Sequence, residues 1–140
     1  MKYCLLYMMV IGMLVACKTV KQEADYCTVP LPQEIILLQE APFLLTDGVE
    51  IHCLETNGQM IHNAQFLAEY LYKATQYDFP IKCGSTGRRA IALELDSISS
   101  ITGSYSIHIS KDKVQITAST EAGIFYAIQT LRKSLPIFYC

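Results

Sequence analysis

The chain has 140 residues, enough for one domain with its own core and too few for the ~250 residues that a (β/α)8 barrel usually needs. Hydrophobic residues make up 51% of the chain and the formal net charge is −2, a balance typical of a globular protein rather than a disordered one. Lys and Arg are scattered and form no basic stripe that could hold phosphates, so no nucleic-acid partner is expected.

The N-terminus has the layout of a signal peptide. Lys2 supplies a short positive region, and Leu5 to Ala16 is an apolar stretch too short to span a ~30 Å hydrocarbon core as a helix. Residues 14–17, Leu-Val-Ala-Cys, resemble a bacterial lipobox, which predicts cleavage after residue 16 and lipid attachment at Cys17. An ordinary secretory signal that precedes a cysteine is the alternative.

The lipobox assigns residues 1–16 to a lipoprotein signal peptide and residues 17–27 to a polar tether. Lipid on both the cysteine sulfur and the new amino terminus would provide more than one acyl chain, which stable anchoring requires. We therefore expect a protein of the bacterial cell envelope, lipid-anchored to a membrane and facing either the periplasm or the outside.

The cysteines and histidines are the candidate residues for disulfides and metal binding. Besides Cys4 in the signal and Cys17 at the anchor, four cysteines remain: Cys27, Cys53, Cys83 and Cys140. An even number in an exported protein permits disulfides in three connectivities, and four unpaired thiols are the alternative. No C-x-x-C pair and no zinc-binding histidine spacing is present, so neither a metal site nor a cofactor is expected.

The first part of the domain is predicted to be extended. Pro30 and Pro32 fix φ and exclude helix, so residues 34–39 can pair as an edge strand or first strand. Two short strand candidates follow at 43–46 and 49–53, on either side of an Asp-Gly turn.

The middle of the chain changes to a helical period. An amphipathic helix is predicted over residues 59–75, because apolar side chains recur at helical spacing at Ile61, Ala64, Leu67, Ala68 and Leu71. Residues 79–82 are a possible short strand, and residues 84–87 have the composition of a turn.

Strand patterns dominate the next segment. Residues 90–95 form a β-rich run typical of a largely buried, central strand. Residues 105–109 and 114–118 each alternate apolar and polar side chains around a polar turn at 110–113, which predicts an antiparallel hairpin with one apolar face.

The last element is predicted to be a helix over residues 121–134, capped by Ser119 or Thr120 and stopped by Pro136. Its core stripe consists of Ile124, Ala127, Ile128, Leu131 and Leu135. The expected fold is therefore α+β: a mostly antiparallel sheet of about four to six strands, with two helices packed on one face.

Two carboxylate pairs are candidates for a general acid and base. Glu94 and Asp96 are two residues apart on a strand and share a face, but their sequence neighbours offer no histidine or aromatic wall. Asp47 lies in the Asp-Gly turn and Glu50 follows it by two residues. Surface carboxylates are common and catalytically poised ones are rare, so both pairs are interpreted as solvated.

Histidine gives no stronger candidate for a catalytic base. His52 and His62 lack a Ser or Cys in a nucleophile-elbow context such as G-x-S-x-G, and His108 alternates out of the apolar face of the hairpin. We predict no catalytic residue in this chain.

Tyrosines near the first helix offer a possible carbohydrate platform. Tyr70, Tyr72 and Tyr77 could stack on sugars, but core packing or an interdomain contact is the preferred interpretation, because amphipathic rings commonly occupy interfaces.

Several motifs come in an order found in one enzyme family. They are P-x-P-Q at residues 30–33, the amphipathic helix, the strand at Ile91, G-S-Y-S-I-H-I-S from Gly103, and T-E-A-G-I-F-Y-A-I-Q-T-L from Thr120. From about Val29 to Pro136 the chain resembles the N-terminal accessory domain of the β-N-acetylhexosaminidases of glycoside hydrolase family 20. Similar domains precede the barrels of O-GlcNAcase-type hexosaminidases and α-glucuronidases, which are the alternative families.

The resemblance implies a domain, residues 28–136, that braces a (β/α)8 catalytic barrel. In that family the barrel removes terminal β-linked N-acetylhexosamine from glycans, using an adjacent Asp-Glu pair and a tryptophan-lined pocket. This chain contains no Asp-Glu dipeptide and no tryptophan, so it is expected to be inactive alone and to meet glycan only through the parent enzyme. Residues 137–140 are interpreted as the truncated start of a linker to the barrel.

Within the last motif, Gly123 is expected to allow close helix packing, and Glu121 to lie where the helix dipole favours an anion. The apolar surface expected to face the barrel consists of Phe125, Tyr126, Ile137, Phe138 and Tyr139. The alternative function is a stand-alone envelope lipoprotein that binds a glycan or another protein; the apolar C-terminal residues favour the fragment.

Overall fold

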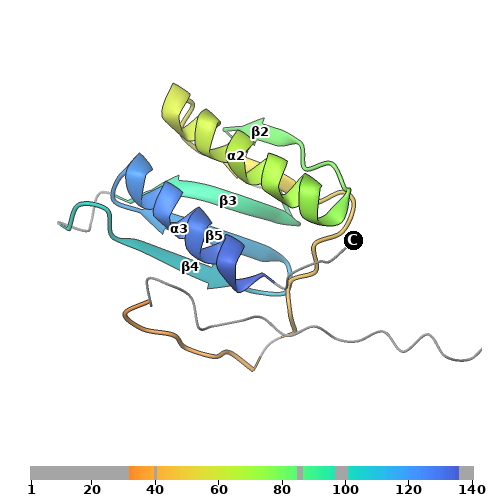
Figure 1. The fold of residues 1–140 in the computed structure, drawn as a ribbon, viewed down its shortest axis with the longest axis horizontal. Helices are drawn as coiled ribbons and strands as arrows, with labels where there is room; N and C mark the ends of the chain where they lie inside the picture. Colours follow the sequence, from red (N-terminus) through yellow and green to blue (C-terminus); the bar gives the residue numbers. More distant parts are fainter. Residues whose placement is uncertain (1–31, 40, 85–86, 97–100, 136–140) are drawn as a thin grey trace, which may run out of the picture.

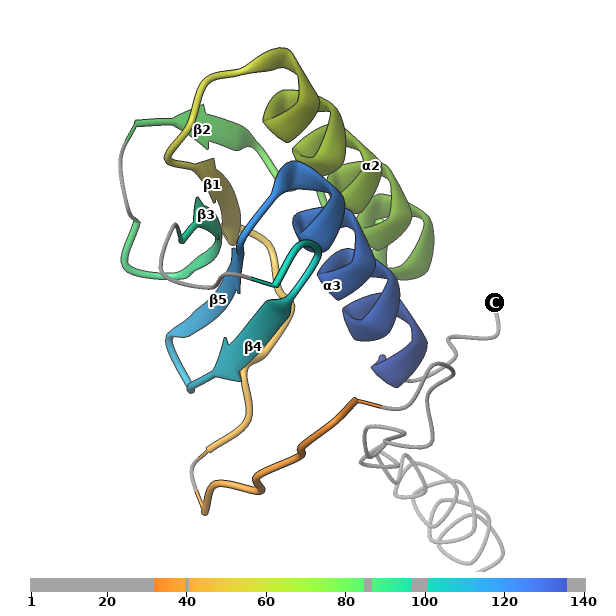
Figure 2. The same ribbon diagram turned by 90° about the vertical axis from the view of Figure 1, so that its left-hand side faces the viewer.

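The fold is a five-stranded sheet with two helices on one face. The computed structural model describes residues 32–39, 41–84, 87–96 and 101–135. Within them the elements follow in the order β1 (Glu50–Cys53), α2 (Gly58–Thr75), β2 (Ile81–Cys83), β3 (Ala90–Leu95), β4 (Tyr105–Ile109), β5 (Lys113–Ala118) and α3 (Glu121–Ser134) (Figure 1). Viewed along the sheet, α2 and α3 lie side by side on the same face (Figure 2). The predicted α+β class is confirmed.

Several predicted segments lie outside the described residues: the signal peptide (1–16), the tether (17–27) with its anchor Cys17, and the linker start (137–140). Of the described helices, neither is long and apolar enough to cross a membrane.

The direction of strand pairing corrects the prediction of a mostly antiparallel sheet. In the order β2-β1-β3-β5-β4, the hairpin β4–β5 is antiparallel, while β1 pairs in parallel with β2 and β3, and β3 pairs in parallel with β5. The reason is that α2 is a crossover between β1 and β2, and crossover connections make neighbouring strands parallel. Apolar alternation along a strand indicates which face is buried and not the direction of the neighbouring strand.

Two strand predictions are wrong and five are confirmed. Residues 34–39 and 43–46 form no strand, and Ile36 and Leu37 are each 69% exposed. Their composition suits a half-buried sheet surface. A strand forms only where a neighbouring strand also supplies hydrogen bonds. By contrast, β1, β3 and the β4–β5 hairpin fall where the pattern predicts them, and the possible strand at 79–82 is β2, starting at residue 81.

The core lies between the sheet and the helices. Buried side chains on the helix-facing side of the sheet include Ile51, Cys53, Ile91, Leu93, Val114 and Ile116. They meet a stripe from each helix: Met60, Ala64, Leu67 and Leu71 on α2, and Ile124, Ala127, Ile128 and Leu131 on α3. The predicted α3 stripe is confirmed. On α2, Met60 is buried and Ile61 is half-buried, so the stripe begins one residue earlier than predicted.

Both helices begin at a side-chain cap. The Asn57 side chain accepts a hydrogen bond from the Met60 amide at 2.9 Å, and the Thr120 side chain accepts one from the Gly123 amide at 3.2 Å. Each cap satisfies a backbone donor that has no partner within the helix. Of the two caps predicted for α3, the structure selects Thr120 over Ser119.

Glu121 joins the first turns of the two helices. Its Oε1 accepts a hydrogen bond from Asn57 Nδ2 at 3.0 Å, and its backbone oxygen accepts one from Asn63 Nδ2 at 2.8 Å. Asn63 is fully buried, so its side-chain amide needs such a partner. Glu121 therefore has the first-turn position predicted from the helix dipole, and in addition holds α3 in register with α2.

Candidate docking surface on the helical layer

An aromatic cluster joins α2 and α3 where they lie side by side. The Phe66 and Phe125 ring centroids are 5.5 Å apart, and the Arg132 guanidinium lies 6.0 Å from the Phe66 centroid and 5.1 Å from that of Tyr70. Tyr70 Oη also donates a hydrogen bond to the Arg132 backbone oxygen at 3.2 Å. We call Phe66, Tyr70, Phe125, Tyr126 and Arg132 the aromatic seam. Its members hold one another in place through ring and cation–π contacts.

Two rings of the aromatic seam remain in solvent. Phe125 is 38% exposed and Tyr126 is 54% exposed, with ring centroids 6.3 Å apart. Both follow Ile124 of the core stripe, and successive helical residues point ~100° apart, so neither can reach the sheet. This exposure confirms that both offer apolar surface. The other predicted members of that surface, Ile137, Phe138 and Tyr139, lie outside the described residues.

Gly123 brings the start of α3 against the hairpin, as predicted. A Cβ at this position would lie 2.9 Å from Ala118 Cβ and 2.9 Å from the Ser104 backbone oxygen. Real side chains do not occupy such distances without displacing a neighbour, and neither neighbour is a flexible side-chain end. The glycine therefore sets how closely α3, and the aromatic seam it carries, approaches the sheet.

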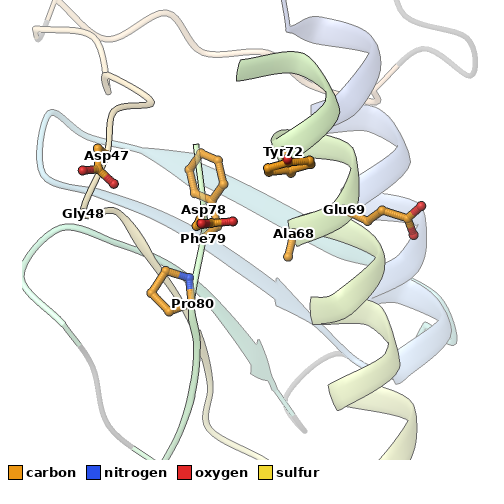
Figure 3. Close-up of a pocket in the computed structure, with 8 residues that line it drawn as sticks. All are labelled: Asp47, Gly48, Ala68, Glu69, Tyr72, Asp78, Phe79 and Pro80. Atoms are coloured by element: carbon orange, nitrogen blue, oxygen red, sulfur yellow. The ribbon is translucent and has the colours of Figure 1, made fainter. Parts of the chain in front are cut away.

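The three tyrosines that could have formed a sugar-binding platform do not lie together in the structure. Tyr70 belongs to the aromatic seam, whereas Tyr72 lines an open groove of about 520 Å³ on another side of α2, and Tyr77 is not among its lining residues. The groove is lined by Asp47, Gly48, Ala68, Glu69, Tyr72, Asp78, Phe79 and Pro80 (Figure 3).

Only part of the groove lining could contact a ligand. The Glu69 carboxylate is directed away from the groove in Figure 3 and pairs with Lys73 at 2.6 Å. That hydrogen bond lowers the pKa of Glu69. Phe79 is buried, which leaves Tyr72, 47% exposed, as the ring available to a sugar, with Asp47 and Asp78 as hydrogen-bond acceptors.

The face of the sheet opposite the helices carries a polar hollow of about 500 Å³. The prediction of a solvated Glu94 is wrong: its side chain lies there only 17% exposed, and its carboxylate accepts hydrogen bonds from Lys113 Nζ at 3.3 Å and Gln115 Nε2 at 2.7 Å. His108 lines the same hollow as Glu94 and Asp96, a neighbour that the linear sequence did not indicate. Because the Glu94 carboxylate is paired with a cation and an amide, it serves cross-strand pairing.

Glu50 and His52, two other candidates for an acid or a base, contact each other. Glu50 Oε2 lies 2.9 Å from His52 Nε2, and His52 is buried next to Gly87, where an added Cβ would lie 2.7 Å from Nε2. Asp47 does not share this contact, and His62 is exposed on α2. Within the described ranges, no group of three or more His, Cys, Asp or Glu side chains could hold a metal ion.

The structure therefore defines an α+β domain with exposed aromatic rings on its helical layer. The model of the family described as "Glycosyl hydrolase family 20, domain 2" matches residues 25–137. The chain belongs to this family. No curated protein sequence matches the chain significantly.

Solved structures similar to this chain include hexosaminidases. A β-N-acetylhexosaminidase from Streptomyces coelicolor is 31% identical with a TM-score of 0.63, and one from Streptomyces plicatus is 30% identical with a TM-score of 0.60. Each match covers 69% of this chain and 19% of the enzyme. A β-N-acetylhexosaminidase from Bacteroides fragilis shares the fold at 19% identity and a TM-score of 0.58, over 78% of this chain and 21% of that one. The chain thus spans about a fifth of the length of these enzymes.

Proposed function

We propose that this domain is the accessory part of a β-N-acetylhexosaminidase and that its aromatic seam packs against the catalytic barrel. The observation that carries the proposal is the pair of exposed rings, Phe125 and Tyr126, on a helix within the family-matched region. The parent enzyme would hydrolyse terminal β-linked N-acetylhexosamine from glycans, with the substrate acetamido group as nucleophile. All of that chemistry would belong to the barrel.

The energetics support a docking role for the aromatic seam. Complete burial of an aromatic side chain covers 150–250 Å². At their exposed fractions, Phe125 and Tyr126 together leave roughly 200 Å² of surface in water. At about 25 cal/mol per Å², covering that surface is worth up to ~5 kcal/mol. Phe66 already restricts the Phe125 ring, which lowers the side-chain entropy lost on docking.

A chimera tests this proposal. The corresponding accessory domain of the Streptomyces coelicolor enzyme would be replaced by residues 32–135 of this chain, and hydrolysis of a chromogenic N-acetylglucosaminide and thermal stability would be measured. We expect activity and a Tm above that of a variant with no accessory domain. The double substitution of Phe125 and Tyr126 to Ser should lower the Tm by several degrees.

The matched control is His108→Ser, which removes an exposed ring on the opposite face and should leave the Tm of the chimera unchanged. A chimera no more stable than the domain-deleted enzyme would contradict the bracing role. Equal effects of the His108 and Phe125/Tyr126 substitutions would show that the aromatic seam is not the contact surface.

A carbohydrate-binding module is the second candidate, and the groove at Tyr72 is the feature that favours it. One exposed ring flanked by Asp47 and Asp78 could stack on a single sugar and accept hydrogen bonds from its hydroxyls. Saturable binding of the isolated domain on a glycan array, lost in Tyr72→Ala and kept in Tyr77→Ala, would support this function over bracing.

We further propose that the protein is an envelope lipoprotein anchored through Cys17. The lipobox-like residues 14–17 and the apolar stretch before them support it. Labelled palmitate should be incorporated when the gene is expressed in a bacterium, and Cys17→Ser should abolish the label. Unchanged labelling of Cys17→Ser, or no labelling of either protein, would exclude the anchor.

A further inference from the structure

Two cysteines face each other across the edge of the sheet. In the parallel pairing of β1 and β2, Cys53 is the register partner of Cys83, and Ile51 is the partner of Ile81 two residues earlier. Residues two apart on a strand share a face. Because Ile51 and Ile81 both pack in the core, Cys53 and Cys83 point to this same helix-facing side.

The separation of the strands suits a disulfide. Neighbouring strands lie ~4.8 Å apart, within the ~4.4–6.8 Å Cα separation of disulfide-bonded cysteines. Both residues are free thiols in the structure; Cys53 is buried and Cys83 is exposed. One sulfur is therefore open to an oxidant and the other is shielded.

The surroundings of Cys53 keep it protonated. Burial, and then the neighbouring Cys83 and Glu55, raise the pKa of the Cys53 thiol to about 11. Its sulfur also lies 3.9 Å from the Met60 backbone oxygen of α2, in donor geometry.

We propose that Cys53 and Cys83 are a disulfide site that staples β2, the three-residue edge strand, to β1. This selects one of the connectivities that the sequence leaves open. The bond would close a loop containing all of α2, so that β2 could no longer separate from β1 at the edge of the sheet. The oxidant is a disulfide, either a small molecule or a thiol–disulfide oxidoreductase.

The reaction proceeds by two exchanges. The Cys83 thiolate attacks the oxidant R–S–S–R, forming a mixed disulfide on Cys83 and releasing one R–SH, which takes the Cys83 proton. The Cys53 thiolate then attacks the Cys83 sulfur, forming the Cys53–Cys83 bond and releasing the second R–SH with the Cys53 proton. Two thiols are oxidised and one external disulfide is reduced. The second exchange is slowed at neutral pH, because little of Cys53 is thiolate there.

The experiment uses oxidised glutathione on the full chain at pH 7.5, 8.5 and 9.5, followed by acid quenching and mass spectrometry. Cleavage after Lys, Arg and Glu places Cys53 in residues 51–55 and Cys83 in residues 83–88, apart from Cys27 and Cys140. We expect a glutathione adduct on Cys83 that converts to the linked pair of peptides. The conversion should accelerate about tenfold per pH unit.

Stability gives a second readout. Oxidation should raise the Tm by on the order of 10 °C in the native chain, because the bond restricts the unfolded state. In Cys83→Ser, whose exposed side chain tolerates the change, oxidation should not shift the Tm. A Cys83 adduct that persists at pH 9.5, a link from Cys83 to Cys27 or Cys140, or equal Tm shifts in both proteins would overturn the proposal.

Discussion

Replacing Gly123 with alanine tests how α3 is seated on the sheet. The new Cβ would lie 2.9 Å from both Ala118 Cβ and the Ser104 backbone oxygen, and 3.3 Å from the Gly103 carbonyl carbon. Since a Cβ and two backbone atoms cannot rotate away, the helix or the hairpin must move. Such overpacking costs about 1–3 kcal/mol, whereas alanine in a helix gains about 0.5–1 kcal/mol over glycine.

The net expectation is a loss of about 1–2 kcal/mol, which lowers the Tm of a domain of this size by roughly 5–15 °C. Thermal unfolding followed by circular dichroism measures it. The matched control is Gly58→Ala at the first turn of α2, where an added Cβ meets no atom within 4 Å. This control should leave the Tm unchanged or raise it slightly, because only the helix-propensity gain remains.

A Tm of Gly123→Ala equal to or above that of Gly58→Ala would refute the reasoning. It would mean that α3 can shift away from the hairpin at little energetic expense. The position of the aromatic seam would then not depend on this glycine. A larger substitution, Gly123→Val, should be worse than alanine if the contact is as close as the structure indicates.

Three further outcomes are expected. Gln76→Gly should stabilise the domain by about 0.5–1 kcal/mol in urea unfolding, because Gln76 ends α2 at a φ of 61° that glycine adopts without strain; a loss of stability would contradict this. Thr120→Ala should cost about 1 kcal/mol in the same assay and Thr120→Ser much less, since the serine hydroxyl can still accept from the Gly123 amide; equal losses would exclude capping. The pKa of Cys53 is raised to about 11, so its contribution to stability is present below pH 9, the ordinary thiol value, and is lost as the pH rises through 11. Urea unfolding at pH 8.5 and 10.5 should show a steeper fall for the reduced native chain than for Cys53→Ala, and parallel curves would refute it.

Features that depend on the spacing of apolar and polar residues close together in the chain could be predicted from the sequence. The alternation over residues 105–118 specifies the β4–β5 hairpin, because a register slip of one residue would move the apolar side chains of one strand to the other face. The stripe from Ile124 to Leu131 specifies the buried face of α3, and Thr120 its start. The exposure of Phe125 and Tyr126 follows from the same periodicity, since they fall outside that stripe.

Features that depend on long-range pairing could not be predicted. The apolar run at 34–39 has the composition of a strand and forms none, because it does not pair with any strand of the sheet that the structure describes. His108 joins the hollow of Glu94 only through the register of β3, β5 and β4. A strand pattern does not show which strand lies beside it or in which direction.

The sequence by itself therefore determined the helices, the hairpin and the family motifs, because these depend on residues close together in the chain. The tertiary structure alone decided the mostly parallel pairing, the contact of Phe66 with Phe125 and the juxtaposition of Cys53 with Cys83. Each of these joins segments brought together by the crossover of α2 or by the packing of the two helices. Those arrangements follow from burying one common core, which no local pattern records.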